Sequence, residues 1–146
     1  MFVHATSVAL KAPDSAWWAV LLRGPSGSGK SDLALRLIEA GGRLVADDQT
    51  HVARHGRALI ARPPPALAGM IEARGVGIVK LARHQLVRRA RVALLVDLVP
   101  ARDVERMPEP KYETLLEIKL RQLALAPFEA SAVTKLRLAL SQIARP

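Results

Sequence analysis

Residues 24–31 form the pattern G-x-x-x-x-G-K-S, which is typical of loops that bind the phosphates of a nucleotide. Glycines let backbone amides turn towards one anion without a Cβ in the way. We expect the ammonium group of Lys30 to reach the β- and γ-phosphates and the hydroxyl of Ser31 to hold Mg²⁺. The predicted phosphate-binding loop comprises Gly24, Pro25, Ser26, Gly27, Ser28, Gly29, Lys30 and Ser31.

Two acidic positions compete for the metal contact and the base that phosphoryl transfer requires. The run RLVADD ends at Asp47 and Asp48, and Asp48 follows Ser31 by 17 residues. Because successive side chains of a strand face opposite ways, the two aspartates are expected to have different roles. The run VALLVD ends at Asp97, which is the usual form of a metal–water contact in phosphate-loop enzymes. From the residues alone, Asp47 and Asp48 could also form a solvated strand end.

The stretch IEARGVGIVKL, residues 71–81, places Glu72 and Arg74 beside two glycines. Residues two apart lie on the same side of an extended chain, so these two side chains could share a phosphate. Taken alone, the pattern favours a surface ion pair on a turn. We interpret the stretch as a loop that runs into a strand.

Short apolar runs separated by turn residues predict many strands and few helices. Apolar residues at 33, 34, 37 and 38 predict a helix after the phosphate-binding loop, which should stop at Gly41-Gly42. We read 101–113 as a polar loop, and 114–127 is ambiguous between a strand pair and a helix. This order predicts one α/β domain over residues 1–146 with a mixed sheet. The other expected elements are strands over 2–10, 17–24, 43–48 and 91–100, a hairpin over 50–64 and a terminal helix over 129–144.

The composition excludes several classes of function. The chain has no cysteine, which rules out disulfides, thiolate catalysis and cysteine-based zinc sites. Its net charge of +9 would suit a nucleic acid, but aromatic residues make up only 3%, too few for a base-stacking platform. We therefore expect no nucleic-acid partner, and the basic residues form a solvated face or dock an acidic partner. We also expect no membrane span, no secretory signal and a cytoplasmic location.

Three pieces in a fixed order, GPSGSGKSD, RLVADD and MIEARGVGIVKL, together with the opening VHAT, resemble the catalytic domain of HPr kinase/phosphorylase. The resemblance covers most of residues 2–108. It implies a phosphate-loop core like that of phosphoenolpyruvate carboxykinase. It also implies an ATP- and Mg²⁺-dependent enzyme that phosphorylates a serine of an HPr-like phosphocarrier and removes that phosphate by phosphorolysis.

The resemblance assigns roles to individual residues. His4 matches an active-site histidine, and Asp48 matches the carboxylate that accepts the serine proton. Ser31 and Glu72 match magnesium contacts, and Asp47, the first carboxylate of VADD, joins this predicted metal set. Lys30 and Arg106 complete the expected catalytic residues, with Arg106 as the best match to an arginine near the site.

The sequence also departs from the family pattern. Typical members carry an additional N-terminal domain, so this chain resembles the short alphaproteobacterial forms. Where the family has a PGRN-like segment tied to phosphorolysis, this chain reads LAPFEASA over 125–132. A homo-oligomer, hexameric in the family, is expected. Two alternatives stay open: a small-molecule or nucleotide kinase that uses Asp97, and a nucleotide-binding regulatory module without catalysis.

Overall fold

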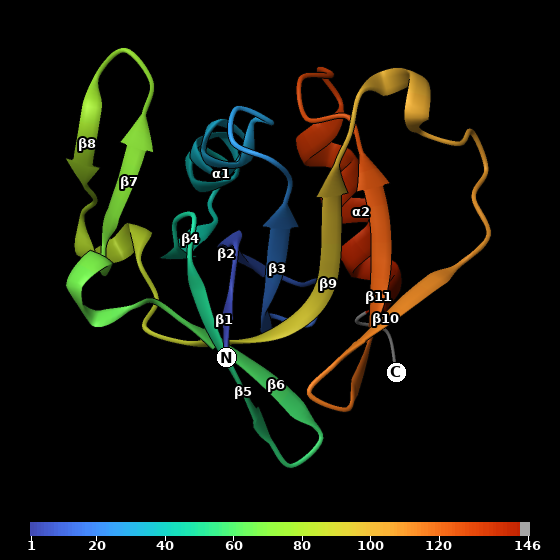
Figure 1. Ribbon diagram of the computed structural model, residues 1–146, viewed down its shortest axis with the longest axis horizontal. Coiled ribbons are helices and arrows are strands. Elements are labelled where there is room, and N and C mark those ends of the chain that lie inside the picture. The colour runs from blue at the N-terminus through green and yellow to red at the C-terminus, as the bar shows by residue number, and fades with distance from the viewer. Residues whose placement is uncertain (144–146) are drawn as a thin grey trace.

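A nine-stranded mixed sheet and two α-helices make up most of the computed structural model, which describes residues 1–143 (Figure 1). A separate two-stranded hairpin, β7–β8, stands at the left edge in Figure 1. None of the described helices is long and apolar enough to cross a membrane. The helices are α1 (Lys30–Glu39) and α2 (Ala132–Ile143), and the strands are β1 (Phe2–Val3), β2 (Ala5–Lys11), β3 (Trp17–Arg23), β4 (Arg43–Ala46), β5 (Thr50–His55), β6 (Ala58–Arg62), β7 (Met70–Ala73), β8 (Gly77–Lys80), β9 (Ala90–Leu98), β10 (Lys111–Leu115) and β11 (Ile118–Leu125).

The strand order is β1-β5-β6-β9-β3-β2-β4, and β11 with its partner β10 joins at β9. Strand β9 runs parallel to β3 and to β11, whereas the other pairs are antiparallel. It pairs with β6 through Ala90 and Arg91 and with β11 through Leu94–Leu98, so two strands share one edge of β9. The predicted α/β class and mixed sheet are confirmed.

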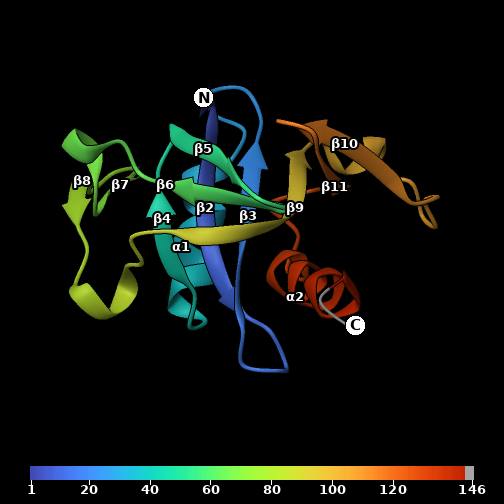
Figure 2. The ribbon, with the colours of Figure 1, turned by 90° about the horizontal axis from the view of Figure 1, so that it is seen from below.

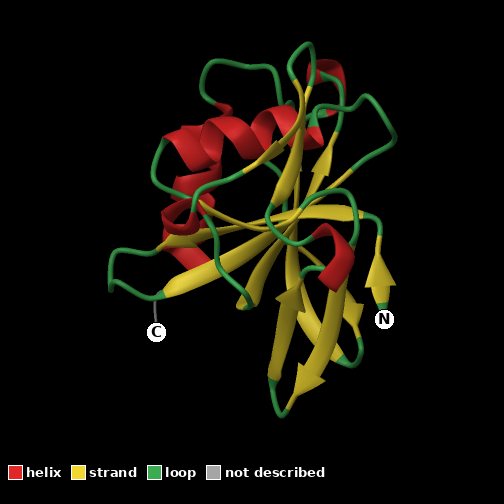
Figure 3. Cartoon of the chain, turned by 90° about the vertical axis from the view of Figure 1, so that its left-hand side faces the viewer, coloured by secondary structure: helices red, strands yellow, loops and turns green. Residues whose placement is uncertain are grey.

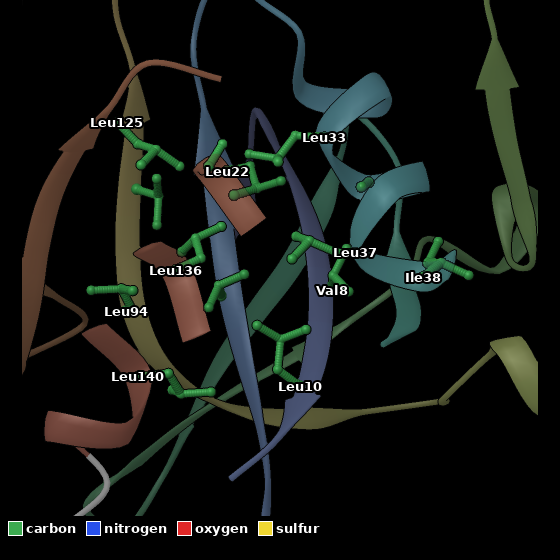
Figure 4. Packing of buried hydrophobic residues seen from close by; sticks show 14 of the residues in the cluster. Val8, Leu10, Leu22, Leu33, Leu37, Ile38, Leu94, Leu125, Leu136 and Leu140 are labelled. Atoms are coloured by element: carbon green, nitrogen blue, oxygen red, sulfur yellow. The ribbon is translucent and has the colours of Figure 1, made fainter. Parts of the chain in front are cut away.

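Both faces of the central strands are buried. Val8, Leu22 and Leu94 face the helices, where they pack with Leu33 of α1 and Leu136 of α2 (Figure 4). The alternate residues of the same strands pack under β5 and β6, which pass across β2 in Figure 2. Figure 3 shows the two helices next to each other on the same side of the strands. Burial on both faces explains why β3 and β9 read as continuous apolar runs.

Helix α1 begins and ends where its residues predict. Gly29, with φ of 100°, directs the chain into the helix, and Leu33, Ala34, Leu37 and Ile38 form its buried face. The amide of Gly42 donates to the carbonyl of Leu37 over 2.8 Å, which closes the helix. The helix therefore joins the sheet through one apolar stripe and presents its amino end at the carboxyl end of β3.

Several boundaries differ from the sequence predictions. The strand expected over 2–10 is interrupted at His4, and the strand expected over 43–48 ends at Ala46. Residues 71–81 were expected to form a loop and a strand, but 70–80 form the β7–β8 hairpin. The ambiguous stretch 114–127 belongs to a strand pair, whose first strand begins at Lys111, inside the predicted polar loop over 101–113. The hairpin over 50–64 is confirmed. The terminal helix begins at Ala132, and residue 144 of that prediction lies outside the described residues.

Candidate active site

A pocket of about 630 Å³ opens beside the amino end of α1. The phosphate-binding loop forms one part of its lining, and the chain after β4 forms another with Asp47 and Asp48. The β7–β8 hairpin contributes Glu72 and Arg74, and Phe128 lies on the rim. Segments far apart in the sequence therefore meet around one pocket, which both polar and apolar side chains line.

The phosphate-binding loop has the geometry of an anion site. Its last residues lead directly into α1, whose first amides lack partners within the helix and favour an anion. Lys30 is buried, and its ammonium group donates to the carbonyls of Gly24 at 2.6 Å and Pro25 at 3.2 Å. A buried ammonium group held by its own loop places a positive charge where phosphates would sit.

Asp47 is the centre of a hydrogen-bond network next to this loop. Its Oδ1 accepts hydrogen bonds from the hydroxyls of Ser31 at 2.6 Å and Thr6 at 3.0 Å. Its Oδ2 accepts the backbone N–H of Glu72 at 3.0 Å, which ties the β7–β8 hairpin to the site. The network thus brings three of the predicted residues together: Ser31 and Asp47 through their side chains and Glu72 through its backbone.

The oxygen atoms around Asp47 suit Mg²⁺. Within residues 1–143, no group of three or more histidine and carboxylate side chains is arranged to hold a metal. Mg²⁺ is usually bound by only one or two carboxylates, with waters and substrate phosphates completing its shell. The Ser31 hydroxyl and the Asp47 carboxylate beside a phosphate-binding loop fit that pattern, and Glu72 lines the same pocket.

Asp48 lines the same pocket but has a different partner from Asp47. It follows the end of β4 with φ of 65°, and its backbone N–H donates to the Thr6 hydroxyl. Its Oδ1 lies 2.8 Å from Nε2 of His4, and both side chains are mostly exposed. The two neighbouring carboxylates therefore have different partners. Asp47 accepts a hydrogen bond from Ser31, whereas Asp48 contacts His4 at the surface.

Asp97 does not line the pocket. Its carboxylate accepts two hydrogen bonds from Arg23, from Nε at 2.9 Å and from Nη2 at 3.1 Å, and one from Gln122 at 2.5 Å. Arg23 also pairs with Glu113 at 2.6 Å, and this contact raises the pKa of Arg23 and lowers that of Glu113. The residue that most resembled a conventional metal acid is thus engaged in a structural ion pair.

Two other predicted residues lie apart from this network. Arg74 lines the pocket at the turn of the β7–β8 hairpin, exposed and with no ion pair to Glu72 among the described residues. Arg106 is exposed on the connection before β10 and does not line the pocket. A role for Arg106 therefore stays a prediction.

Two residues of the site were not predicted from the sequence. Thr6 looked like an ordinary strand residue, yet its hydroxyl bonds to both aspartates. Phe128 lay in an unpatterned segment, yet its ring contacts the loop at Gly29. The cue for Thr6 was a hydroxyl residue within the mostly apolar run ATSVALK, and the cue for Phe128 was a single aromatic residue within LAPFEASA.

Comparison with known proteins gives the family of this chain. A family model described as the HPr Serine kinase C-terminal domain matches residues 16–136. The chain belongs to this family. The match includes the phosphate-binding loop, both aspartates and the β7–β8 hairpin, whereas His4 precedes it.

Proteins named HPr kinase/phosphorylase share this family domain. The relative from Leptothrix cholodnii is 39% identical over 117 residues, which cover 73% of this chain and 36% of the relative. The relative from Variovorax paradoxus is 34% identical over 134 residues, which cover 85% of this chain and 42% of the relative. The chain therefore spans about two-fifths of the length of these curated relatives.

A solved structure has the same fold. The HPr(Ser) kinase/phosphatase from Coxiella burnetii superposes with a TM-score of 0.78 and 24% sequence identity, over 98% of this chain and 93% of that chain. The mixed sheet with its carboxy-terminal helix is thus the fold of an HPr kinase catalytic domain.

Proposed function

We propose that this domain transfers the γ-phosphate of ATP to a serine hydroxyl of an HPr-like phosphocarrier protein. The observation that carries the proposal is that two adjacent carboxylates have different surroundings. Asp47 accepts a hydrogen bond from Ser31 beside the phosphate-binding loop, whereas Asp48 is exposed and contacts His4. The names of the relatives, HPr kinase/phosphorylase, supply the class of acceptor.

The residues of the chain would act by positioning and by moving one proton. The loop amides and Lys30 bind the phosphates of ATP. Ser31, Asp47 and Glu72 would hold Mg²⁺, which neutralises phosphate charge when it is bound. Asp48 accepts the proton of the acceptor serine as its oxygen bonds to the γ-phosphorus, while the bond to the β-phosphate oxygen breaks and ADP leaves.

His4 would orient this base. Its Nε2 lies 2.8 Å from Oδ1 of Asp48, so the ring fixes the direction in which the carboxylate points. Because Asp48 is 63% exposed, a hydroxyl on another protein has access to it. An exposed base at the mouth of a pocket favours a macromolecular acceptor over a small one enclosed by a lid.

The reverse reaction would use the same groups. An oxygen of inorganic phosphate attacks the phosphoserine phosphorus, the serine oxygen takes the proton from Asp48, and pyrophosphate is released. The relatives are named for this activity as well as for the kinase. Addition of phosphate to the phosphorylated acceptor, followed by a pyrophosphate assay, tests it directly.

The test of the kinase proposal is incubation with ATP, Mg²⁺ and an HPr-like protein, followed by mapping of the phosphorylated residue. We expect one phosphoserine, and Asp48→Asn should lower the rate about 10²- to 10⁴-fold, as loss of a general base does. ATP binding should persist in that variant. Asp103→Asn, a change of the same kind at an exposed residue outside the pocket, is the control.

Other outcomes would point to other functions. Unchanged turnover in Asp48→Asn removes Asp48 from the mechanism. ATP binding without transfer to any phosphocarrier indicates a regulatory module. Assembly into a homo-oligomer stays a prediction, which sedimentation of the purified chain would test.

A further inference from the structure

The rim of the pocket carries an aromatic side chain that the proposed phosphoryl transfer does not use. Phe128 is 70% exposed and lines the pocket. Single exposed apolar side chains are common on protein surfaces, so its exposure alone indicates nothing. Its position is informative, because a Cβ built on Gly29 would lie only 2.9 Å from Cζ of Phe128. The ring therefore touches the backbone of the phosphate-binding loop.

Side chains of both helices contact the turn that carries this ring. Arg36 of α1 donates a hydrogen bond to the carbonyl of Pro127, and Lys135 of α2 pairs with Glu129 at 2.6 Å. The ring of Pro127 also lies against Gly29. The backbone on either side of Phe128 is thus fixed, and a ring on a fixed turn can contact a ligand with little further ordering.

The order of the strands indicates which end of a nucleotide reaches Phe128. Asp47 and Asp48 follow β4, whereas Phe128 follows β11, and β3, which leads into the loop, lies between β4 and β11 in the sheet. In Figure 1 the turn after β11 lies on the opposite side of α1 from the β7–β8 hairpin. A triphosphate with its γ end beside the aspartates therefore directs its nucleoside towards Phe128.

We propose that Phe128 stacks against the base of the bound nucleotide. This inference rests on the proposed function for nucleotide binding and for the position of the γ-phosphate beside the aspartates, and not for the identity of the acceptor. Stacking uses the π-face that every base has, so it gives affinity with little selection between bases. Phe128 would thus add affinity for a nucleoside triphosphate over a bare polyphosphate, and ATP and GTP would both benefit.

The experiment compares three ligands that each carry three phosphates, of which two have a base and one has none. Binding of ATP, GTP and inorganic tripolyphosphate, each with Mg²⁺, is measured by calorimetry on the full chain and on its variants. Phe128→Ala should raise the Kd for ATP and GTP about tenfold, within the range for loss of one base–aromatic contact. The Kd for tripolyphosphate should stay within about twofold, because its contacts are with the loop.

The chain offers two matched controls. Phe128→Tyr keeps the aromatic face and should bind ATP as the unchanged chain does. Phe2→Ala removes the other phenylalanine, which is 62% exposed and lies outside the pocket, and should alter none of the three affinities.

Three outcomes overturn the inference. Equal weakening of ATP and tripolyphosphate in Phe128→Ala means that the ring only supports the loop. Unchanged nucleotide affinity with a raised KM for the acceptor protein places the ring against the acceptor instead. Failure of the unchanged chain to prefer ATP over tripolyphosphate removes any contact with the base. If ATP binding depends on Phe128 but no serine is phosphorylated, the proposed function fails and the base contact stands.

Discussion

Thr6 contacts both aspartates of the site although its side chain is fully buried in β2. Its hydroxyl donates to Oδ1 of Asp47 and accepts the backbone N–H of Asp48, each over 3.0 Å. One oxygen atom thus fixes the carboxylate proposed for the metal and the backbone of the proposed base. A buried hydroxyl with both of its bonds made is costly to lose, because its partners then stay unsatisfied.

Thr6→Val should therefore disturb stability and activity together. The substitution keeps the shape and leaves the Asp48 amide without its partner, so we expect a loss of about 1–3 kcal/mol in the free energy of unfolding. The phosphoryl-transfer rate should fall, and the Mg²⁺ concentration for half-maximal rate should rise. Urea denaturation and a Mg²⁺ titration of the rate measure these effects.

Thr6→Ser is the matched control, because serine keeps the hydroxyl and loses only a methyl group. It should retain the Mg²⁺ dependence of the unchanged chain. If Thr6→Val and Thr6→Ser behave alike, the hydroxyl does not organise the aspartates.

At the scale of elements, Arg23 connects three strands next to the phosphate-binding loop. It is the last residue of β3, and its guanidinium group bonds to Asp97 of β9 and to Glu113 of β10. Gly24, the next residue, begins the loop. The cluster therefore fixes the end of β3, from which the loop departs. It also engages Asp97, the carboxylate that the alternative small-molecule kinase would need as its metal contact.

This ion pair predicts a pH dependence of stability. The hydrogen bond from Arg23 lowers the pKa of Glu113 in the folded chain, so the unfolded chain binds more protons as the pH falls. The stabilisation from Glu113 is complete above its unfolded pKa of about 4.3 and is lost as the pH falls through the lower folded value. The difference in unfolding free energy between the unchanged chain and Glu113→Gln should be largest near neutral pH and should shrink in acid.

Denaturant unfolding at a series of pH values between neutrality and pH 3 measures that difference. Glu109→Gln, on the exposed connection before β10, is the control and should change the free energy of unfolding at neutral pH by less than about 0.5 kcal/mol. A constant difference across the series for Glu113→Gln would show that its charge does not contribute through Arg23.

At the scale of the whole molecule, the helices and the β5–β6 hairpin cover opposite faces of the same strands. Helix α2 packs through Leu136 and Leu140 against the sheet, close to α1. It also continues from the turn that holds Phe128 beside the loop. The packing of α2 thus supports both the core and one rim of the pocket.

Leu136→Ala should cost about 2–5 kcal/mol of unfolding free energy, because it removes a fully buried side chain and leaves a cavity. Leu138→Ala makes the same chemical change two residues later at a side chain that is 59% exposed, and should cost less than about 0.5 kcal/mol. Urea denaturation of both variants measures the contrast. Equal costs would mean that α2 does not pack on the sheet through the face that includes Leu136.

The sequence by itself determined the elements whose signals are local. The phosphate-binding loop and the ends of α1 follow from glycines and from a helical stripe. The strand predicted over 91–100, which the structure places at Ala90–Leu98, follows from its apolar run. Asp47 and Asp48 were identified by their distance from the loop and by the resemblance. The loop, the helix ends and the strand need only the preferences of neighbouring residues, so local sequence patterns are sufficient to find them.

Only the tertiary structure decided which distant side chains contact one another. Asp97 ends an apolar strand as a metal acid would, but its register opposite Arg23 commits it to an ion pair. Thr6 and Phe128 became part of the site because β2 and the turn after β11 meet the loop in space. The break at His4 and the left-handed backbone of Asp48 bring those two side chains together across 44 residues of sequence. Such contacts depend on strand order and register, which no local pattern encodes.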